Sequence, residues 1–413
     1  LSGDVVQCKF WGLGSDGTVG ANHNTVQIIN TYTDKFAQAY FEYDAKKSFG
    51  ITKSHLRFGD KPIDASYFVK QADFIACHNQ SFIGQYEIVQ ELKPGGTFLL
   101  NCSWPEEELA EKLPACVLRQ LAEKNITFYT IDASAIAQEL GLGGHVNMVL
   151  QAAFFAVSQI IPLHDAISYM KDAAYKTYFA KGDEVVARNQ AAIDRGAASV
   201  RCIRVPDSWK LAQDMPRPAE DGRPAVVKNI LEPINRQKGD DLPVSAFLDY
   251  KDGAIELGLT AYEKRNIAVK IPKWNQDRCI QCNQCSLVCP HAVIRPYLLN
   301  GAENEKKPEG FVTVPAKGPS AKGYYFSLQV SEADCTGCGV CVNACPVKDK
   351  AIEMVPAQDV KTDDPCWAYG LGLSDKGDVF DPYSIKGSQF RQPLVEFSAA
   401  CAGCGETPYA KLL

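Results

Sequence analysis

Runs of apolar residues with a period of two or of about 3.6 divide the first half of the chain into predicted strands and helices. The predicted strands are short and rich in β-branched and aromatic residues, at 5–10, 36–43, 73–77, 97–101, 126–131 and 200–205. Helical patterns predict one helix that follows the first strand and ends at about residue 32, helices at 82–92 and 106–124, and three helices between 145 and 196. Strands that alternate with helices predict a parallel sheet covered by helices, an α/β fold.

The periodicity weakens after residue 206, and the chain there becomes charged and punctuated by prolines. Such a stretch is typical of an extended linker or a small wrapping domain, which we place at 207–248. The remaining residues divide at the cysteine motifs described next. We therefore expect four parts, at 1–206, 207–248, 249–365 and 366–413.

Two cysteine runs in the second half share one spacing, C-x2-C-x2-C-x3-C-P. The first run contains Cys279, Cys282, Cys285 and Cys289, and the second contains Cys335, Cys338, Cys341 and Cys345. Every cysteine of the second run lies 56 positions after its counterpart (335 against 279), which indicates an internal duplication. This spacing is that of bacterial ferredoxins with two [4Fe–4S] clusters, in which the fourth cysteine of each run ligates the other cluster. We therefore assign Cys279, Cys282, Cys285 and Cys345 to one cluster, and Cys335, Cys338, Cys341 and Cys289 to the second, in an α+β ferredoxin-like domain.

Zinc sites and disulfides are the alternatives for these cysteines. A structural zinc site takes four ligands from two short pairs, whereas each run here supplies four thiols within eleven residues. Disulfide frameworks belong to small secreted chains, and this chain has 413 residues and no export signal. Both alternatives explain the spacing less well than two clusters do.

A glycine-rich segment, Gly12-Leu-Gly-Ser-Asp-Gly-Thr-Val-Gly20, joins the first predicted strand to the first helix. This arrangement directs backbone N–H groups and a helix N-terminus at a diphosphate, although a tight turn that needs glycine has the same pattern. Glu42 and Asp44 end the second strand, where an acid binds the ribose in NAD sites. Lys46 and Lys47 follow at once and suit an additional phosphate. Asp16 fits an anion site if its carboxylate faces ligand hydroxyls and leaves the phosphates to the backbone.

The remaining cysteines and the histidines give weaker signals. Cys401 and Cys404 form a C-x2-C pair followed by Glu406, either a redox dithiol or two ligands whose partners lie elsewhere. Five scattered cysteines are expected to be buried thiols, at positions 8, 77, 102, 116 and 202. Cys366 stays unplaced. No two of the six histidines have metal-ligand spacing, so we assign none of them to chemistry.

Composition narrows the class of protein. The chain is 46% hydrophobic and 22% charged with a net charge of −6, and it has no basic stretch of the kind that binds nucleic acid. The longest apolar stretch, 148–161, is shorter than a membrane span. Sixteen cysteines without an export signal favour a reducing, cytoplasmic location. Because residue 1 is Leu, we expect a segment of a larger polypeptide.

The order of these motifs resembles pyruvate:ferredoxin (flavodoxin) oxidoreductase. The strand–GLGSDGTVG–helix opening, the duplicated cysteine run and the terminal CAGCGE correspond to the middle of that family's chain. The resemblance implies that a coenzyme A domain comes first, and that thiamine-type domains precede and follow the segment. It also implies a homodimer when the protein is full length.

By this resemblance, Ser15, Asp16, Gly17, Thr18 and Val19 would cradle coenzyme A rather than NAD. Lys47 would contact a coenzyme A phosphate, and Asn147 and Arg188 would be further contacts. Cys401 and Cys404 would be two ligands of a third [4Fe–4S] cluster, and Glu406 would line the pocket for thiamine diphosphate and Mg²⁺ in the full-length enzyme.

The implied reaction converts a 2-oxoacid and coenzyme A into acyl-CoA and CO2, and passes two electrons one at a time to ferredoxin or flavodoxin. No side chain of this segment is a candidate for the decarboxylation itself. A stand-alone electron-transfer module and an NAD-linked iron–sulfur subunit are the competing hypotheses, and neither explains all of the motifs.

Overall fold

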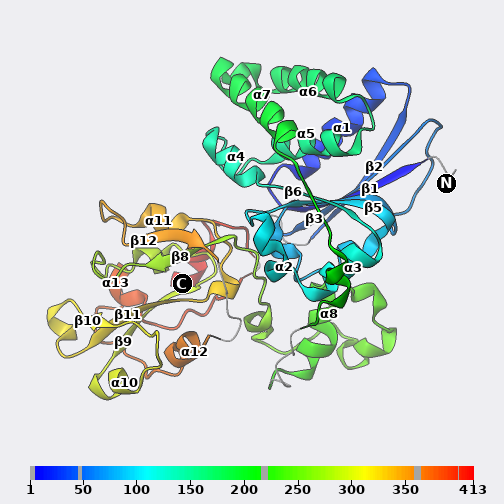
Figure 1. The fold of residues 1–413 in the computed structure, drawn as a ribbon. Helices are drawn as coiled ribbons and strands as arrows, with labels where there is room; N and C mark the ends of the chain where they lie inside the picture. Colours follow the sequence, from blue (N-terminus) through cyan, green and yellow to red (C-terminus); the bar gives the residue numbers. More distant parts are fainter. Residues whose placement is uncertain (1–4, 45–48, 215–221, 358–363, 399) are drawn as a thin grey trace. The chain divides into compact units, whose positions relative to one another are not determined.

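The computed structural model describes residues 5–44, 49–214, 222–357, 364–398 and 400–413. Contacts divide the chain into two compact units, Leu1–Glu220 and Asp221–Leu413 (Figure 1). Each unit has its own apolar core. No helix in the described part of the chain is long and apolar enough to cross a membrane.

The first unit is built on a seven-stranded sheet with the order β2-β3-β1-β4-β5-β6-β7. Its strands are β1 (Val6–Leu13), β2 (Phe36–Tyr43), β3 (Ile51–Gly59), β4 (Ala72–Cys77), β5 (Leu92–Asn101), β6 (Thr127–Ile131) and β7 (Arg201–Ile203). β1 and β4–β6 pair in parallel, whereas β3 runs antiparallel to β1 and β2, and β7 runs antiparallel to β6. The predicted α/β class is confirmed, with a mixed rather than wholly parallel sheet.

Strand β3 was not among the predicted strands. It reads Ile-Thr-Lys-Ser-His-Leu-Arg-Phe-Gly, and the polar side chains of Lys53, His55 and Arg57 alternate with the others. His55 and Arg57 are nevertheless buried, because they pair with groups on the same sheet face, including Glu42 and Gln38 of β2. A buried strand that carries three basic side chains lacks the apolar signal on which strand prediction depends.

Helices cover both faces of this sheet (Figure 1). One face carries α1 (Thr18–Tyr32), α4 (Ala133–Glu139), α5 (Asn147–Ser158), α6 (Leu163–Tyr178) and α7 (Asp183–Ala198). The three helices predicted between 145 and 196 are therefore confirmed. The helix predicted at 106–124 is interrupted at Pro114, because proline cannot continue a helix, and forms η3 (Glu106–Glu108), α2 (Leu109–Lys112) and α3 (Ala115–Glu123). The helix predicted at 82–92 is wrong, since only the short turns η1 (Gln80–Phe82) and η2 (Val89–Glu91) form there.

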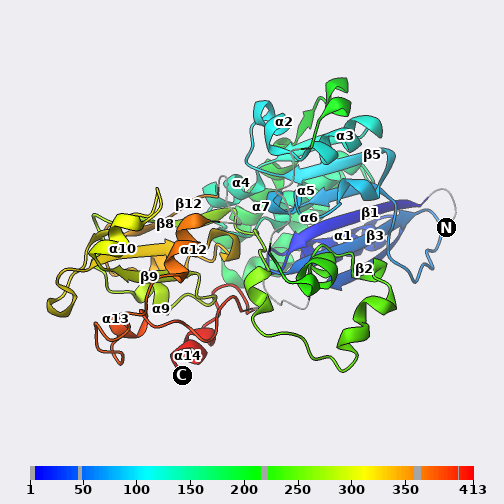
Figure 2. The same cartoon turned by 90° about the horizontal axis from the view of Figure 1, so that it is seen from below.

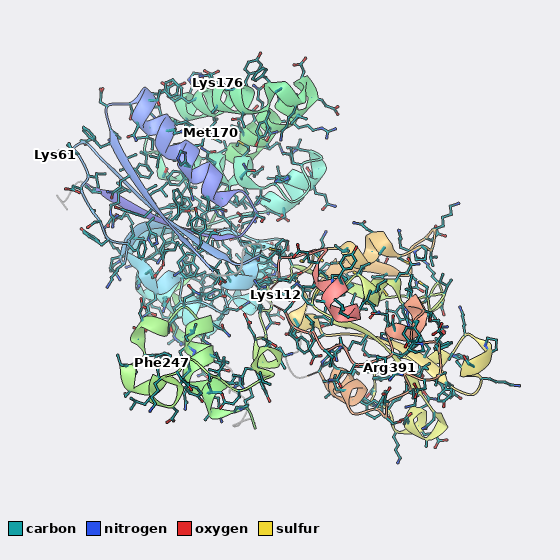
Figure 3. All side chains as sticks on the ribbon, turned by 180° about the vertical axis from the view of Figure 1, so that it is seen from behind. Lys61, Lys112, Met170, Lys176, Phe247 and Arg391 are labelled. Atoms are coloured by element: carbon teal, nitrogen blue, oxygen red, sulfur yellow. The ribbon has the colours of Figure 1, made fainter. Side chains whose placement is uncertain are left out.

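The core of the first unit centres on α5, which is apolar on nearly all sides. Phe154 of α5 contacts the rings of Phe10 on β1 and Phe74 on β4, both at 5.1 Å between centroids. Met170 of α6, labelled among the helices in Figure 3, is 1% exposed. This packing holds α5 against the neighbouring strands β1 and β4.

The second unit contains two short antiparallel sheets. β8 (Lys270–Trp274) pairs with β12 (Ile352–Pro356), and β11 (Tyr325–Val330) pairs with both β9 (Ile294–Leu299) and β10 (Val314–Pro315). Its α-helices are α8 (Glu232–Asn235), α9 (Gln284–Leu287), α10 (Gly301–Lys306), α11 (Val340–Ala344), α12 (Pro365–Leu371), α13 (Ile385–Ser388) and α14 (Thr407–Leu412). Helices α9 and α11 begin 56 residues apart, at Gln284 and Val340, as the duplication requires. Figure 2 shows α13 beside α9 in this unit.

The segment that begins the second unit has little regular structure. Between 224 and 262 it forms one helical stretch, η6 (Val227–Leu231) continued by α8, and otherwise short turns, with a small apolar cluster of Val226, Val227, Ile230 and Leu259. The weak periodicity of the sequence reflects this lack of long elements. The four predicted boundaries stay a prediction.

A helical glycine offers a test of the packing in the first unit. A Cβ atom added to Gly196 of α7 would lie 2.4 Å from the backbone oxygen of Val149 in α5. Gly196→Ala should therefore lower the free energy of unfolding by about 1–3 kcal/mol, because the two helices must separate. Gly20→Ala in α1 is the control, since its Cβ would meet no atom within 4 Å. Urea unfolding of both variants tests the contact, and equal stability of the two would contradict it.

Candidate functional sites

The glycine-rich loop closes tightly between β1 and α1. Ser15 and Gly17 have φ angles of 77° and 88°, in the left-handed region that favours glycine. A Cβ atom on Gly12 would lie 2.6 Å from Thr18 Oγ1 and 2.8 Å from Thr52 Oγ1. Glycine is therefore required at position 12 by close approach and favoured at position 17 by backbone conformation.

The carboxylate of Asp16 is turned into this loop. It accepts hydrogen bonds from the backbone N–H groups of Leu13 and Thr18, each at 2.8 Å. Both carboxylate oxygens of Asp16 are thus used within the loop before α1, and not held free for ligand hydroxyls as expected. Within the described residues, no acceptor is recorded for the backbone N–H groups of Val19 and Gly20, which stay open to an anion at the helix N-terminus.

Of the other predicted contacts, Asn147 lies beside the loop and Arg188 contacts the segment before α5. Asn147 begins α5, and its Cβ is 2.9 Å from the position of a Cβ on Gly17. Arg188 of α7 packs against Gly141 in the loop before α5, where its Nη1 donates to the backbone oxygen at 3.5 Å, and it pairs with Glu184. The structure thus brings Ser15–Val19 together with Asn147, and ties Arg188 to the segment that leads into Asn147.

Of the candidates for binding a ribose or a further phosphate, Glu42 lies within the described sheet. Glu42 binds His55 Nε2 at 2.5 Å and Lys53 Nζ at 3.5 Å, so its carboxylate is already used within the sheet. These partners hold the pKa of Glu42 below its usual range against the opposing effect of burial. Lys47 and Lys46 lie outside the described residues.

His78 is a residue of this site that the sequence analysis missed. It follows β4, the parallel neighbour of β1, and its Nδ1 lies 2.7 Å from Thr18 Oγ1. Its backbone N–H donates to Trp11, and its backbone oxygen accepts from Asn101 Nδ2. Burial lowers the pKa of His78 to about 4, against a raising effect of Asp16, so the imidazole is neutral. A lone histidine carries no spacing signal, and only the rule that ligands gather at the carboxyl ends of parallel strands points to it.

The first cysteine run lines a hollow in the second unit. Cys279, Cys282 and Cys285 surround it together with Cys345 of the second run, with Phe326, Leu328 and Ile352 as apolar walls. The fourth cysteine at this hollow thus comes from the other run. Four thiols in an apolar setting fit the donor set of a [4Fe–4S] cluster.

The other four cysteines form the corresponding group. Cys289 influences the pKa of both Cys335 and Cys341, and so does Cys338. Burial, reinforced by these neighbouring thiols, raises the pKa of Cys335 and Cys341 to about 12. Cluster ligands are thiolates, so cluster binding must release these protons. Across the residues that the structure describes, no three His, Cys, Asp or Glu side chains converge on a single metal ion.

The terminal pair lies beside the second run. A Cβ on Gly403, between Cys401 and Cys404, would lie 3.9 Å from Cys338 Cβ and 3.3 Å from Val340 Cγ2. Backbone N–H groups of Thr407 and Glu406 lower the pKa of the Cys404 thiol. Glu406 is exposed before α14, and its N–H lies 3.4 Å from Cys404 Sγ.

The scattered cysteines divide into two kinds. Cys8, Cys77 and Cys102 are buried as predicted, and burial raises the pKa of Cys77 to about 12 and of Cys102 to about 11. Cys116 and Cys202 are exposed, so the prediction of burial is wrong for them. Cys116 lies on the outer side of α3, and Cys202 lies on the edge strand β7.

Comparisons with known proteins match three parts of the chain. Residues 7–199 match the family described as pyruvate ferredoxin/flavodoxin oxidoreductase, 212–268 match a domain of unknown function, and 278–349 match a 4Fe-4S dicluster domain. The chain is 52% identical over 408 residues to pyruvate:ferredoxin oxidoreductase of Moorella thermoacetica, which covers 98% of this chain and 35% of that protein.

The chain belongs to the pyruvate:ferredoxin/flavodoxin oxidoreductase family and matches one segment of its longer members. It is also 50% identical to pyruvate-flavodoxin oxidoreductase of Klebsiella pneumoniae, covering 99% of this chain and 35% of that one. Pyruvate dehydrogenase [NADP(+)] of Cryptosporidium parvum is 45% identical, over 100% of this chain and 23% of that protein. The chain thus spans about a third or less of the length of these relatives.

The neutral state of His78 predicts a pH dependence of stability. Its folded pKa of about 4 lies below the ordinary 6.5, so the unfolded chain binds the proton first as pH falls. Its contribution is complete above pH 6.5 and is lost as pH falls towards 4, by at most about 3 kcal/mol. His78→Gln should flatten the decline in unfolding free energy over this window. His23→Gln, at an exposed position of α1, is the control. If both variants decline as steeply as the original chain, His78 does not carry this dependence.

Proposed function

We propose that this chain is the coenzyme A-binding and electron-transfer part of an enzyme that oxidises a 2-oxoacid, pyruvate first among them, to acyl-CoA and CO2. The observation that carries the proposal is that one chain holds both the glycine-rich loop after β1, with its open N–H groups, and the eight cysteines of the two runs. An electron-transfer module alone would have no use for the first unit.

The proposed coenzyme A site uses the loop Ser15–Val19 with Asn147 beside it. The N–H groups of Val19 and Gly20 at the start of α1 offer an anion site for the diphosphate. Asp16, Gly17 and Thr18 shape the loop, with His78 behind Thr18. Arg188 positions the segment before Asn147, and Lys47 would supply the charge for a further phosphate.

The proposed electron path runs through the cysteine groups in order. Cys279, Cys282, Cys285 and Cys345 would hold one [4Fe–4S] cluster, and Cys335, Cys338, Cys341 and Cys289 the other. Each cluster accepts and releases one electron at a time. Because Gly403 packs beside Cys338, the second-run cluster would lie next to the terminal pair, and the first-run cluster would lie farther along the path. Cys401 and Cys404 would ligate a third cluster with cysteines from outside this segment.

The remaining parts of the proposal concern the whole protein. Thiamine diphosphate with Mg²⁺ would supply the carbanion chemistry in domains outside this segment, and Glu406 would contribute to that pocket. Loss of two electrons, of CO2 from the oxoacid and of the thiol proton from coenzyme A would leave the acyl group bonded to the sulfur of coenzyme A. The electrons would pass to ferredoxin or flavodoxin, the acceptors in the relatives' names. A homodimer and a cytoplasmic location complete the proposal.

The cluster assignment is tested by serine variants of the two runs. The chain should bind about eight iron and eight sulfide after anaerobic reconstitution, four of each per cluster. Cys341→Ser should remove or alter the signal of the second-run cluster, whereas Cys345→Ser should affect the first-run cluster, as seen by electron paramagnetic resonance. Loss of the same signal in both variants would contradict the crossed assignment. Cys202→Ser is the control, because its thiol is exposed on β7.

The coenzyme A assignment is tested by calorimetry on the same chain. Lys47→Ala should weaken binding of coenzyme A roughly ten- to a hundredfold, the expected effect of a charge-assisted bond to phosphate of about 1.5–3 kcal/mol. Dephospho-CoA should be affected less if the 3′-phosphate is the group contacted. Lys61→Ala is the matched control, since Lys61 points away from the sheet at the edge of the unit in Figure 3. A chain that binds no coenzyme A, or prefers NADH, would overturn the proposal.

A further inference from the structure

The two cysteine runs repeat one backbone conformation with different residues. Gln281 and Asn283 have φ angles of 58° and 61°, and their counterparts 56 positions later, Gly337 and Gly339, have 70° and 74°. The conformation has a purpose in both runs. The backbone N–H of Gln281 lies 3.3 Å from Cys279 Sγ, and that of Gly337 lies 3.4 Å from Cys335 Sγ.

Glycine adopts this left-handed conformation without strain, whereas glutamine does so rarely. The first run therefore carries side chains at positions where the second run shows that none is needed. Both side chains are nearly fully buried, with Gln281 1% and Asn283 2% exposed. A strained and buried polar residue persists where its side chain makes compensating contacts.

The contacts of these two side chains lead to two lysines. Gln281 Oε1 accepts from the backbone N–H of Lys317 at 2.7 Å, and its Nε2 donates to the backbone oxygen of Pro315 at 2.9 Å. Asn283 Nδ2 donates to the backbone oxygen of Lys386 at 2.9 Å. Lys317 lies between β10 and β11, in the long insertion that separates the two runs (residues 295–334), and Lys386 lies in α13.

Both ammonium groups are then turned towards the first run. Lys317 Nζ donates to the backbone oxygen of Cys279 at 2.8 Å. Lys386 Nζ donates to the backbone oxygen of Lys317 at 2.5 Å and lies 4.2 Å from the ring centroid of Phe380. Lys386 is also close enough to Cys282 and Cys279 to interact with both thiols electrostatically. Phe380 itself packs against Gly318, where a Cβ would lie 2.9 Å from its ring.

We propose that Lys317 and Lys386, held by Gln281 and Asn283, form a cationic clamp that raises the reduction potential of the first-run cluster. An added electron makes a cluster more negative, so nearby fixed cations stabilise the reduced form. The clamp would make the first-run cluster, the one farther from Cys401, the more favourable place for the electron. Electrons would therefore move along the path towards that cluster. This inference rests on the proposed ligation of the first-run cluster by Cys279, Cys282, Cys285 and Cys345.

The test is a redox titration of the anaerobically purified, cluster-loaded protein, followed by electron paramagnetic resonance. Neutralising both lysines (Lys317→Gln with Lys386→Gln) should lower the equilibrium constant for reducing the first-run cluster about tenfold, which is about 59 mV for a one-electron couple. The second-run cluster of the same molecule is the internal reference. Lys411 interacts with Cys289 and Cys285, one cysteine of each group, and it is unchanged in every variant. The shift should shrink at high salt, because Lys317 is exposed.

Three further variants separate charge from structure. Lys317→Arg with Lys386→Arg keeps the charge and should keep most of the potential. Lys322→Gln, at an exposed lysine of the same insertion, should leave it unchanged. Gln281→Gly with Asn283→Gly copies the second run, relieves the backbone and releases the clamp, so it should lower the first-run potential while both lysines stay in the chain.

The possible failures are distinguishable. If the unmodified protein and the control Lys322→Gln both lack the first-run signal and four of the eight iron, the proposed ligation is wrong. With both clusters present, an unchanged first-run potential in the double glutamine variant, or equal shifts of both clusters, would overturn the clamp. A change confined to the dissociation constant for an acidic acceptor protein, with the potential unchanged, would likewise overturn it and would assign the lysines to docking. An unchanged potential in the double glycine variant would overturn the positioning role of Gln281 and Asn283.

Discussion

The second unit depends on the pairing of its two halves across each other. β8, before the first cysteine run, pairs with β12, after the second, and β9 after the first run pairs with β11 before the second. These two ladders bring Cys345 to the hollow lined by Cys279, Cys282 and Cys285. Neither cysteine group can form from one half alone, so the fold of the unit and its capacity for clusters arise together.

The two halves of this unit differ at the two left-handed backbone positions of each cysteine run. The second run keeps glycine at both left-handed positions, and a Cβ on Gly337 would lie 3.0 Å from the backbone oxygen of Lys270. The first run has room for side chains there and uses them to hold the insertion between the runs. That insertion, longer than a ferredoxin-like pair of strands needs, thus has a structural role beside the first run.

How far the sequence predicts the structure depends on where the signal resides. Spacing alone predicted the eight cysteine ligands and a crossed grouping, which agrees with the place of Cys345 at the hollow of the first run, and strand–helix alternation predicted the α/β class. Strand β3 was missed because its buried basic residues are hydrogen-bonded by partners that are distant in sequence, such as Glu42 for His55 and Gln38 for Arg57. His78 was missed for the same reason, since its meaning comes from the parallel register of β4 beside β1. Residues whose role depends on a long-range neighbour carry no local pattern.

The glycine-rich loop shows how a carboxylate can belong to the proposed phosphate site. Asp16 uses its oxygens to accept from Leu13 and Thr18 N–H, so its charge is balanced by the start of α1 and does not face the ligand. Thr18, pinned by this bond and by His78, fixes the direction of the next amides, those of Val19 and Gly20. The negative residue thereby orders the N–H groups that the proposed site would offer to an anion. A loop without Asp16 would carry less negative charge but would lose both of these hydrogen bonds, which hold the backbone before α1.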